Sequence, residues 1–153
     1  MCKIKSNPAS NPTATSRHNP GFESINMVLG LENDDYLHKM PEKDVYSQLI
    51  DCFRLRAEDE LNFAGNIRGI YDGEDPRPVF KEFLDFAESR DKILPRWWNN
   101  EKRALCEKMA VEDNWYNINS VVEKSDIMEH YKDNMMPMKL RILAEKIYGK
   151  GFM

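Results

Sequence analysis

The most restrictive feature of this sequence is an apolar residue at every third or fourth position of a long, otherwise charged stretch. Its members are Tyr46, Leu49, Ile50, Phe53, Ala57, Leu61 and Ala64. This spacing puts apolar side chains on one face of an α-helix, whereas a half-buried strand alternates every second residue. Pro41 suits the first turn of such a helix and Gly65 its end. The sequence therefore predicts a helix over residues 41–64.

The charged run over residues 54–60 belongs to the same predicted helix. Arg54 and Glu58 stand four residues apart, as do Arg56 and Glu60, and opposite charges at that spacing stabilise a helix slightly. We interpret the run as solvated helix surface, with a charge network to another helix as the alternative.

Further helical patterns follow, and no segment alternates with period two over more than a few residues. Asp75 can cap a second helix whose first residue is Pro76, after a turn-rich connection over residues 65–75. Pro137 begins the last helix and Gly149 ends it. The remaining helices are expected over residues 99–111, 115–123 (anchored by Trp115, Ile118, Val121 and Val122) and 126–131 (capped by Ser125).

The inward faces of these helices follow from the same spacing. In the second helix they are Val79, Phe80, Phe83, Leu84 and Ala87, and in the third Leu105, Cys106, Met109 and Ala110. The predicted fold class is all-α: a single compact domain of about six helices with a disordered N-terminal tail. The domain organisation is a tail over residues 1–24 rich in Asn, Pro, Ser and Thr, a transitional segment over 25–40, and a helical domain over 41–153.

Composition excludes several classes of protein. Of the 153 residues 31% are charged, and the net charge is −4, which argues against a broad electrostatic grip on nucleic acid or anionic lipid. No apolar run approaches the roughly 20 residues of a membrane-spanning helix, so no membrane partner is expected. The first 22 residues carry cations without acids, as transit peptides do, but three prolines argue against an amphipathic helix there. We expect an intracellular protein, cytoplasmic or nuclear, with a mitochondrial location as the weaker alternative.

The reactive residue types are widely scattered. Cys2, Cys52 and Cys106 include no close pair of the kind that structural zinc sites use, and their wide spacing fits free thiols in a reducing compartment. Glu129 and His130 lack the second histidine of a metalloprotease helix. We therefore predict no metal, no cofactor, no catalytic residue and no enzymatic activity. The alternative is a small enzyme whose site is assembled from dispersed acidic residues and His130.

Large aromatic and methionine side chains give the candidate binding site. Adjacent residues of a helix point about 100° apart, so Trp97 and Trp98 cannot both face one core. Met135, Met136 and Met138 crowd one turn around Pro137. Because aromatic residues and methionine are favoured at protein interfaces, we predict that exposed members of both groups bind a protein partner. Ordinary core packing is the alternative for all five residues.

Several strings carry a resemblance to a known family. They are residues 53–60 (FRLRAEDE), 94–98 (LPRWW) with 101–103 (EKR), 122–127 (VEKSDI), 136–141 (MPMKLR) and 147–152 (IYGKGF). Over roughly residues 44–152 the chain resembles the helical region beside the zinc finger of MYND-type proteins of filamentous fungi. The finger's cysteine spacing is absent, so zinc binding is not carried over. The resemblance implies a helical companion domain with a regulatory or scaffolding role in a fungal cell.

These observations predict a non-enzymatic helical module for protein–protein interaction, whose partner and oligomeric state the sequence leaves open. A nucleic-acid-associated factor is a further alternative. It would use the cations of the last helix, Lys139, Arg141, Lys146 and Lys150, although Glu145 interrupts them and the chain as a whole is acidic.

Overall fold

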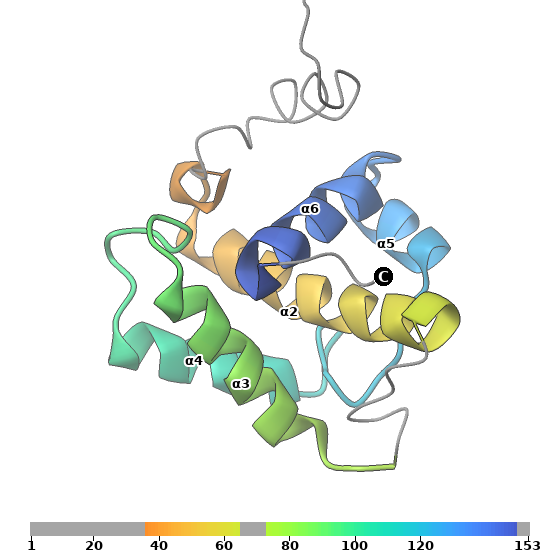
Figure 1. Ribbon diagram of the computed structural model, residues 1–153, viewed down its shortest axis with the longest axis horizontal. Coiled ribbons are helices and arrows are strands. Elements are labelled where there is room, and N and C mark those ends of the chain that lie inside the picture. Colours follow the sequence, from red (N-terminus) through yellow and green to blue (C-terminus); the bar gives the residue numbers. More distant parts are fainter. Residues whose placement is uncertain (1–35, 65–72, 150–153) are drawn as a thin grey trace, which may run out of the picture. The chain divides into compact units, whose positions relative to one another are not determined.

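Helix α2 (Glu42–Asp59) runs through the middle of the helices that surround it (Figure 1). The computed structural model describes residues 36–64 and 73–149. Every residue of α2 from Val45 to Arg56 is buried. The sequence predicted one apolar stripe on this helix and a solvated charged face on its other side. Because the charged positions Arg54, Arg56 and Asp59 are buried as well, that expectation is wrong. Arg54, Arg56 and Asp59 are buried because other elements supply partners for their charges.

Two short elements flank α2. The 3₁₀ turn η1 (Tyr36–Lys39) precedes it and buries Leu37 in the core. A π-helical stretch, η2 (Glu60–Ala64), continues it, so that α2 and η2 together occupy the range predicted for the first helix. The predicted tail over 1–24, residues 25–35 of the transitional segment and most of the turn-rich connection lie outside the described residues.

Helix α3 (Pro76–Ser89) begins and packs as predicted. The Asp75 carboxylate accepts a hydrogen bond from the Arg77 amide at 3.0 Å, and proline occupies the first helical turn. The five expected positions, Val79, Phe80, Phe83, Leu84 and Ala87, are buried. Phe80 and Phe83 meet Phe53 of α2 with ring centroids 5.1 and 5.6 Å apart. These rings join α3 to the central helix.

Helix α4 (Asn100–Val111) is capped by Asn99, whose side chain accepts from the Lys102 amide at 2.9 Å. Cys106, Met109 and Ala110 are buried, as expected. Leu105 was expected to face inward, but its side chain is 44% exposed. It lies one position before Cys106, about 100° round the helix, and so leaves the buried face.

The segment over residues 112–123 forms turns, so the helix predicted over 115–123 is wrong. The Asn114 side chain accepts from the Tyr116 amide at 2.7 Å, and the Asn117 side chain accepts from the Asn119 amide at 2.7 Å. Asparagine side chains compete in this way with helical hydrogen bonding. Ile118 and Val122 are nevertheless buried, whereas Val121 is exposed.

The last two helices, α5 (Lys124–Tyr131) and α6 (Met136–Tyr148), lie across α2 from α4 (Figure 1). Helix α5 begins earlier than predicted, and the Asp126 carboxylate, in place of the expected Ser125 cap, accepts from the Glu123 amide at 2.9 Å. Helix α6 packs on α2, α3 and α5. It ends as predicted at Gly149, whose φ of 79° suits glycine.

The described residues are all helix and turn, without a strand, and this confirms the all-α fold class. No helix among them has the length and apolar character to cross a membrane.

Candidate functional site

A buried carboxylate, Asp51, occupies the middle of α2. It accepts hydrogen bonds from the Tyr131 hydroxyl of α5, from Trp115 Nε1 at 3.1 Å and from Arg54 Nη1 at 2.9 Å. Burial raises the pKa of the Asp51 carboxyl, while these donors lower it. Arg54 also donates to the carbonyl oxygens of Trp115 and Ser120. The cluster therefore fastens the 112–123 turns and α5 to the central helix.

His130 lies on the outer side of the same cluster. Its ring stacks on Trp115 with centroids 4.2 Å apart and planes 7° apart, and its Nε2 lies 3.2 Å from the Tyr116 hydroxyl. Burial lowers the pKa of His130. The imidazole thus holds Tyr116 in position. Each polar atom of this cluster named above already has a hydrogen-bond partner within the protein.

The two predicted tryptophans share one partner. The rings of Trp97 and Trp98 both meet the Tyr46 ring edge-on, with centroids 6.0 and 6.1 Å away. Both are half-buried, and Trp98 Nε1 donates to Glu88 at 2.8 Å. The expected division into one core ring and one exposed ring is therefore absent, because Tyr46 lies where both can pack.

The predicted methionines divide between core and surface. Met136 is buried, and its sulfur lies 4.0 Å from the Tyr36 hydroxyl. Met135 and Met138 are 42% and 38% exposed. These two exposed members remain candidates for contact with a partner, whereas Met136 belongs to the core.

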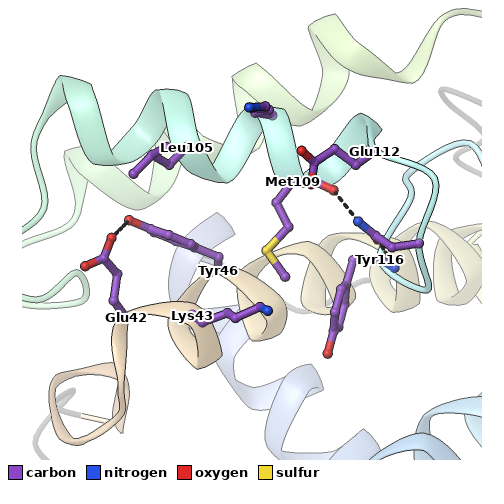
Figure 2. Close-up of a pocket in the computed structure, with 9 residues that line it drawn as sticks. Glu42, Lys43, Tyr46, Leu105, Met109, Glu112 and Tyr116 are labelled. Atoms are coloured by element: carbon purple, nitrogen blue, oxygen red, sulfur yellow. Dashed lines mark hydrogen bonds between the residues drawn. The ribbon is translucent and has the colours of Figure 1, made fainter.

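A hollow of about 490 Å³ lies between α2, α4 and the first turns after α4 (Figure 2). Tyr46, Met109 and Tyr116 line it, and Leu105 stands at its edge. Figure 2 shows Met109 projecting from α4 between the Tyr46 and Tyr116 rings. The charged side chains around it are Glu42, Lys43, Lys108 and Glu112, with Asn114 completing the lining. The hollow thus combines an apolar floor with a charged rim.

Hydrogen bonds on both sides hold the walls of this hollow. The Tyr46 hydroxyl donates to Glu42 at 2.6 Å, and Lys102 Nζ lies 3.2 Å from the same carboxylate. These two donors lower the pKa of Glu42. At the other end, Asn114 and His130 fix Tyr116. His130, which stacks on Trp115 beside Asp51, thus supports the Tyr116 wall of the hollow without lining it.

A second hollow of about 280 Å³ lies between α3 and α4. Lys108 lines both hollows, so α4 separates them as a ridge. The other lining residues are Arg77, Phe80, Lys81, Ala104, Glu107, Val111 and Ile118.

The larger hollow was not predicted from the sequence, because Leu105 was assigned to the core. A signal was present in α4, where apolar residues occupy positions 104–106 and 109–111, more of the circumference than one buried face needs. Leu105 and Val111 lie at the margins of that broad face, and both are exposed.

The remaining predicted residues are dispersed. Cys52 and Cys106 are buried free thiols whose pKa values burial raises, and Cys2 lies outside the described residues. Within residues 36–64 and 73–149, no three His, Cys, Asp or Glu side chains lie together as metal ligands would. Lys139 and Arg141 are paired with Asp133 and Asp59, and this neutralises part of the basic set on the last helix.

Comparison of the chain with protein-family models, curated proteins and solved structures finds no match.

Proposed function

We propose that this chain is a non-enzymatic helical module that binds a segment of a partner protein between α2 and α4. The observation that carries the proposal is the hollow of about 490 Å³, with Tyr46, Met109 and Leu105 on its apolar side and charged residues around it. Protein interfaces have this composition, with aromatic residues and methionine at the centre and a polar rim. The exposed Leu105 side chain gives a partner apolar area to bury.

A binding role fits the chemistry of the ionisable groups better than a catalytic one. Asp51 accepts from Tyr131, Trp115 and Arg54, and His130 is held between Trp115 and Tyr116. Neither Asp51 nor His130 lines either hollow. Groups with these contacts serve to position the turns after α4. The resemblance to MYND-associated helical regions favours a regulatory or scaffolding role for the module.

We also propose an intracellular location, in the cytoplasm or nucleus. The support is that Cys52 and Cys106 are buried cysteines without a disulfide partner among the described residues, as is common in compartments that keep thiols reduced.

The test compares two exposed apolar positions on different helices. Leu105→Glu places a charge at the edge of the hollow, and Met138→Glu places one on α6, at the second candidate surface. Tagged wild-type and variant proteins are recovered from the native cell, and their stoichiometric partners are identified by mass spectrometry. We expect Leu105→Glu to lose a partner that Met138→Glu retains. Urea unfolding of each purified variant shows that both remain folded.

The opposite result, with the partner lost in Met138→Glu and retained in Leu105→Glu, would move the binding surface to the start of α6. Retention of every partner by both variants would contradict the proposal for the α2–α4 hollow.

A further inference from the structure

The exposed side of α4 carries apolar side chains between the two hollows. Ala104, Leu105, Lys108 and Val111, which we call the α4 ridge, lie at helical spacing and are all exposed. Leu105 and Val111 are 44% and 42% exposed. Leu105 borders the larger hollow and Val111 the smaller, while Lys108 lines both. The two hollows and the ridge therefore form one continuous surface centred on Lys108.

The charges around this surface differ in their pairing. Among the acids, Glu42 is bound by Lys102, and Glu107 by Arg103 at 2.8 Å. Among the cations, Lys43, Lys81 and Lys108 form no ion pair with any described residue, while Arg77 is paired with Asp75 at 2.7 Å. Glu112 is the rim acid that lacks a cationic partner within the described residues.

The charge left over is therefore positive on a chain whose net charge is −4. Three lysines at this surface can each form an ion pair with a carboxylate of a ligand, whereas only one acid there can form an ion pair with a cation of a ligand. Complementary charge at the rim of an interface sets which partner docks and how fast, while the apolar centre supplies buried area. The surface therefore fits a ligand that carries apolar and acidic side chains together.

We propose that the ligand of this surface is an acidic amphipathic peptide segment of a partner protein. Its apolar side chains enter the two hollows on either side of the α4 ridge, and its carboxylates face Lys43, Lys81 and Lys108. The inference rests on the function proposed above and specifies the chemistry of the partner.

A peptide library provides the test. The probes are amphipathic peptides of about 16 residues with a fixed apolar face, whose flanking positions are randomised among Glu, Gln and Lys. They are selected on the full chain, and the selected peptides are measured by fluorescence anisotropy at low and high salt. We expect Glu to be enriched at the flanks, and binding to weaken as salt rises.

Two matched double variants assign the preference to this surface. Lys43→Glu/Lys108→Glu reverses two lysines of the rim, and Lys124→Glu/Arg96→Glu reverses two exposed cations outside either hollow. Each replacement changes the charge by −2, so both doubles go from −4 to −8. We expect the rim double to bind the acidic peptide about tenfold more weakly, whereas the control double stays within about twofold of the wild type. If either double unfolds at lower urea, the glutamine versions replace it.

Several outcomes overturn the inference. They are selection of Lys-flanked peptides, equal selection of all three flanks, no selected peptide, and equal weakening by both doubles. Displacement of the acidic peptide by a single-stranded oligonucleotide at equal affinity would assign the surface to nucleic acid. If the native partner still depends on Leu105, any of these results leaves the proposed function standing and removes only the acidic chemistry.

Discussion

The Asp59 carboxylate of α2 accepts two hydrogen bonds from the Arg141 guanidinium of α6, each 3.0 Å long. The Asp59 side chain is buried, while a third of the Arg141 side chain remains exposed. A two-point contact of this kind fixes the orientation of α6 on α2 as well as neutralising a buried charge. It also explains why a charged residue can occupy the innermost helix.

Removal of the guanidinium should therefore be costly. We expect Arg141→Met to lower the free energy of unfolding by about 3 kcal/mol, because it leaves the Asp59 carboxylate buried without its partner. The double variant Asp59→Asn/Arg141→Met should recover part of that loss, since the buried charge is then gone. Urea unfolding measures both. A loss below about 1 kcal/mol would show that the pair behaves like a surface salt bridge.

The shared contact of the two tryptophans with Tyr46 predicts similar effects of replacing them. Trp97→Ala and Trp98→Ala should each lower the free energy of unfolding by about 2 kcal/mol, because each ring is half-buried against the same side chain. Phe83→Ala, in the core, is the reference and should cost about 3–5 kcal/mol. A loss as large as that of Phe83→Ala in one tryptophan variant, with no loss in the other, would contradict equal packing.

The Asn117 side chain should stabilise the turns after α4. Its amide donates to the Glu112 carbonyl at 2.7 Å and accepts from the Asn119 amide at 2.7 Å. We expect Asn117→Ala to cost about 1–2 kcal/mol, since two hydrogen bonds are lost. The neighbouring Asn119 side chain is exposed, so Asn119→Ala should change stability by less than about 0.5 kcal/mol. Equal unfolding midpoints for the two variants would remove Asn117 as the organiser of this segment.

Stability should fall in mild acid because of His130. Burial lowers the pKa of this imidazole from its ordinary 6.5; the nearby Asp51 raises it and Arg54 lowers it further. The unfolded chain then binds the proton at a higher pH than the folded chain does. The stabilisation is therefore complete above about pH 6.5 and is lost as the pH falls through the folded pKa.

The variant His130→Phe isolates this effect, because it keeps an aromatic ring on Trp115 and removes the titrating group. Urea midpoints measured at about pH 7.5 and about pH 5.5 should fall more for the wild type than for His130→Phe. The Asp51 carboxyl is present in both proteins, so its own titration affects both. An identical fall in the two would contradict the assignment to His130.

The helices of this fold were predictable where a local signal determined them. Asp75 followed by Pro76 marked the start of α3, and Gly149 marked the end of α6, because caps and proline act within one turn. The buried face of α3 followed from its spacing. These features depend on residues close together in the sequence.

The burial of charged residues in α2 could not be predicted in the same way. Arg54 is buried because carbonyl groups of the 112–123 turns accept its hydrogen bonds, and Asp59 because Arg141 lies opposite. Both partners are more than sixty positions away in the sequence. A charge pattern read along one helix contains no information about such distant partners, and therefore suggested a solvated face.

The candidate site was missed for a related reason. Hydrophobicity marks Leu105 as apolar, but whether an apolar side chain at the margin of a helix is covered depends on the neighbouring element. The turns after α4 leave a hollow at that place, and Asn114 and Asn117 rather than apolar spacing determine their path.

The enclosure of α2 also restricts how this sequence can vary. From Val45 to Arg56, where every residue of α2 is buried, few positions accept a replacement freely, and buried charged residues depend on partners in other elements. Exchange of Asp59 for a neutral residue should be tolerated only together with a change at Arg141, and exchange of Asp51 only together with changes at Tyr131 or Trp115. In related chains these positions should therefore change in concert, while the α4 ridge is free to diverge with the partner that it binds.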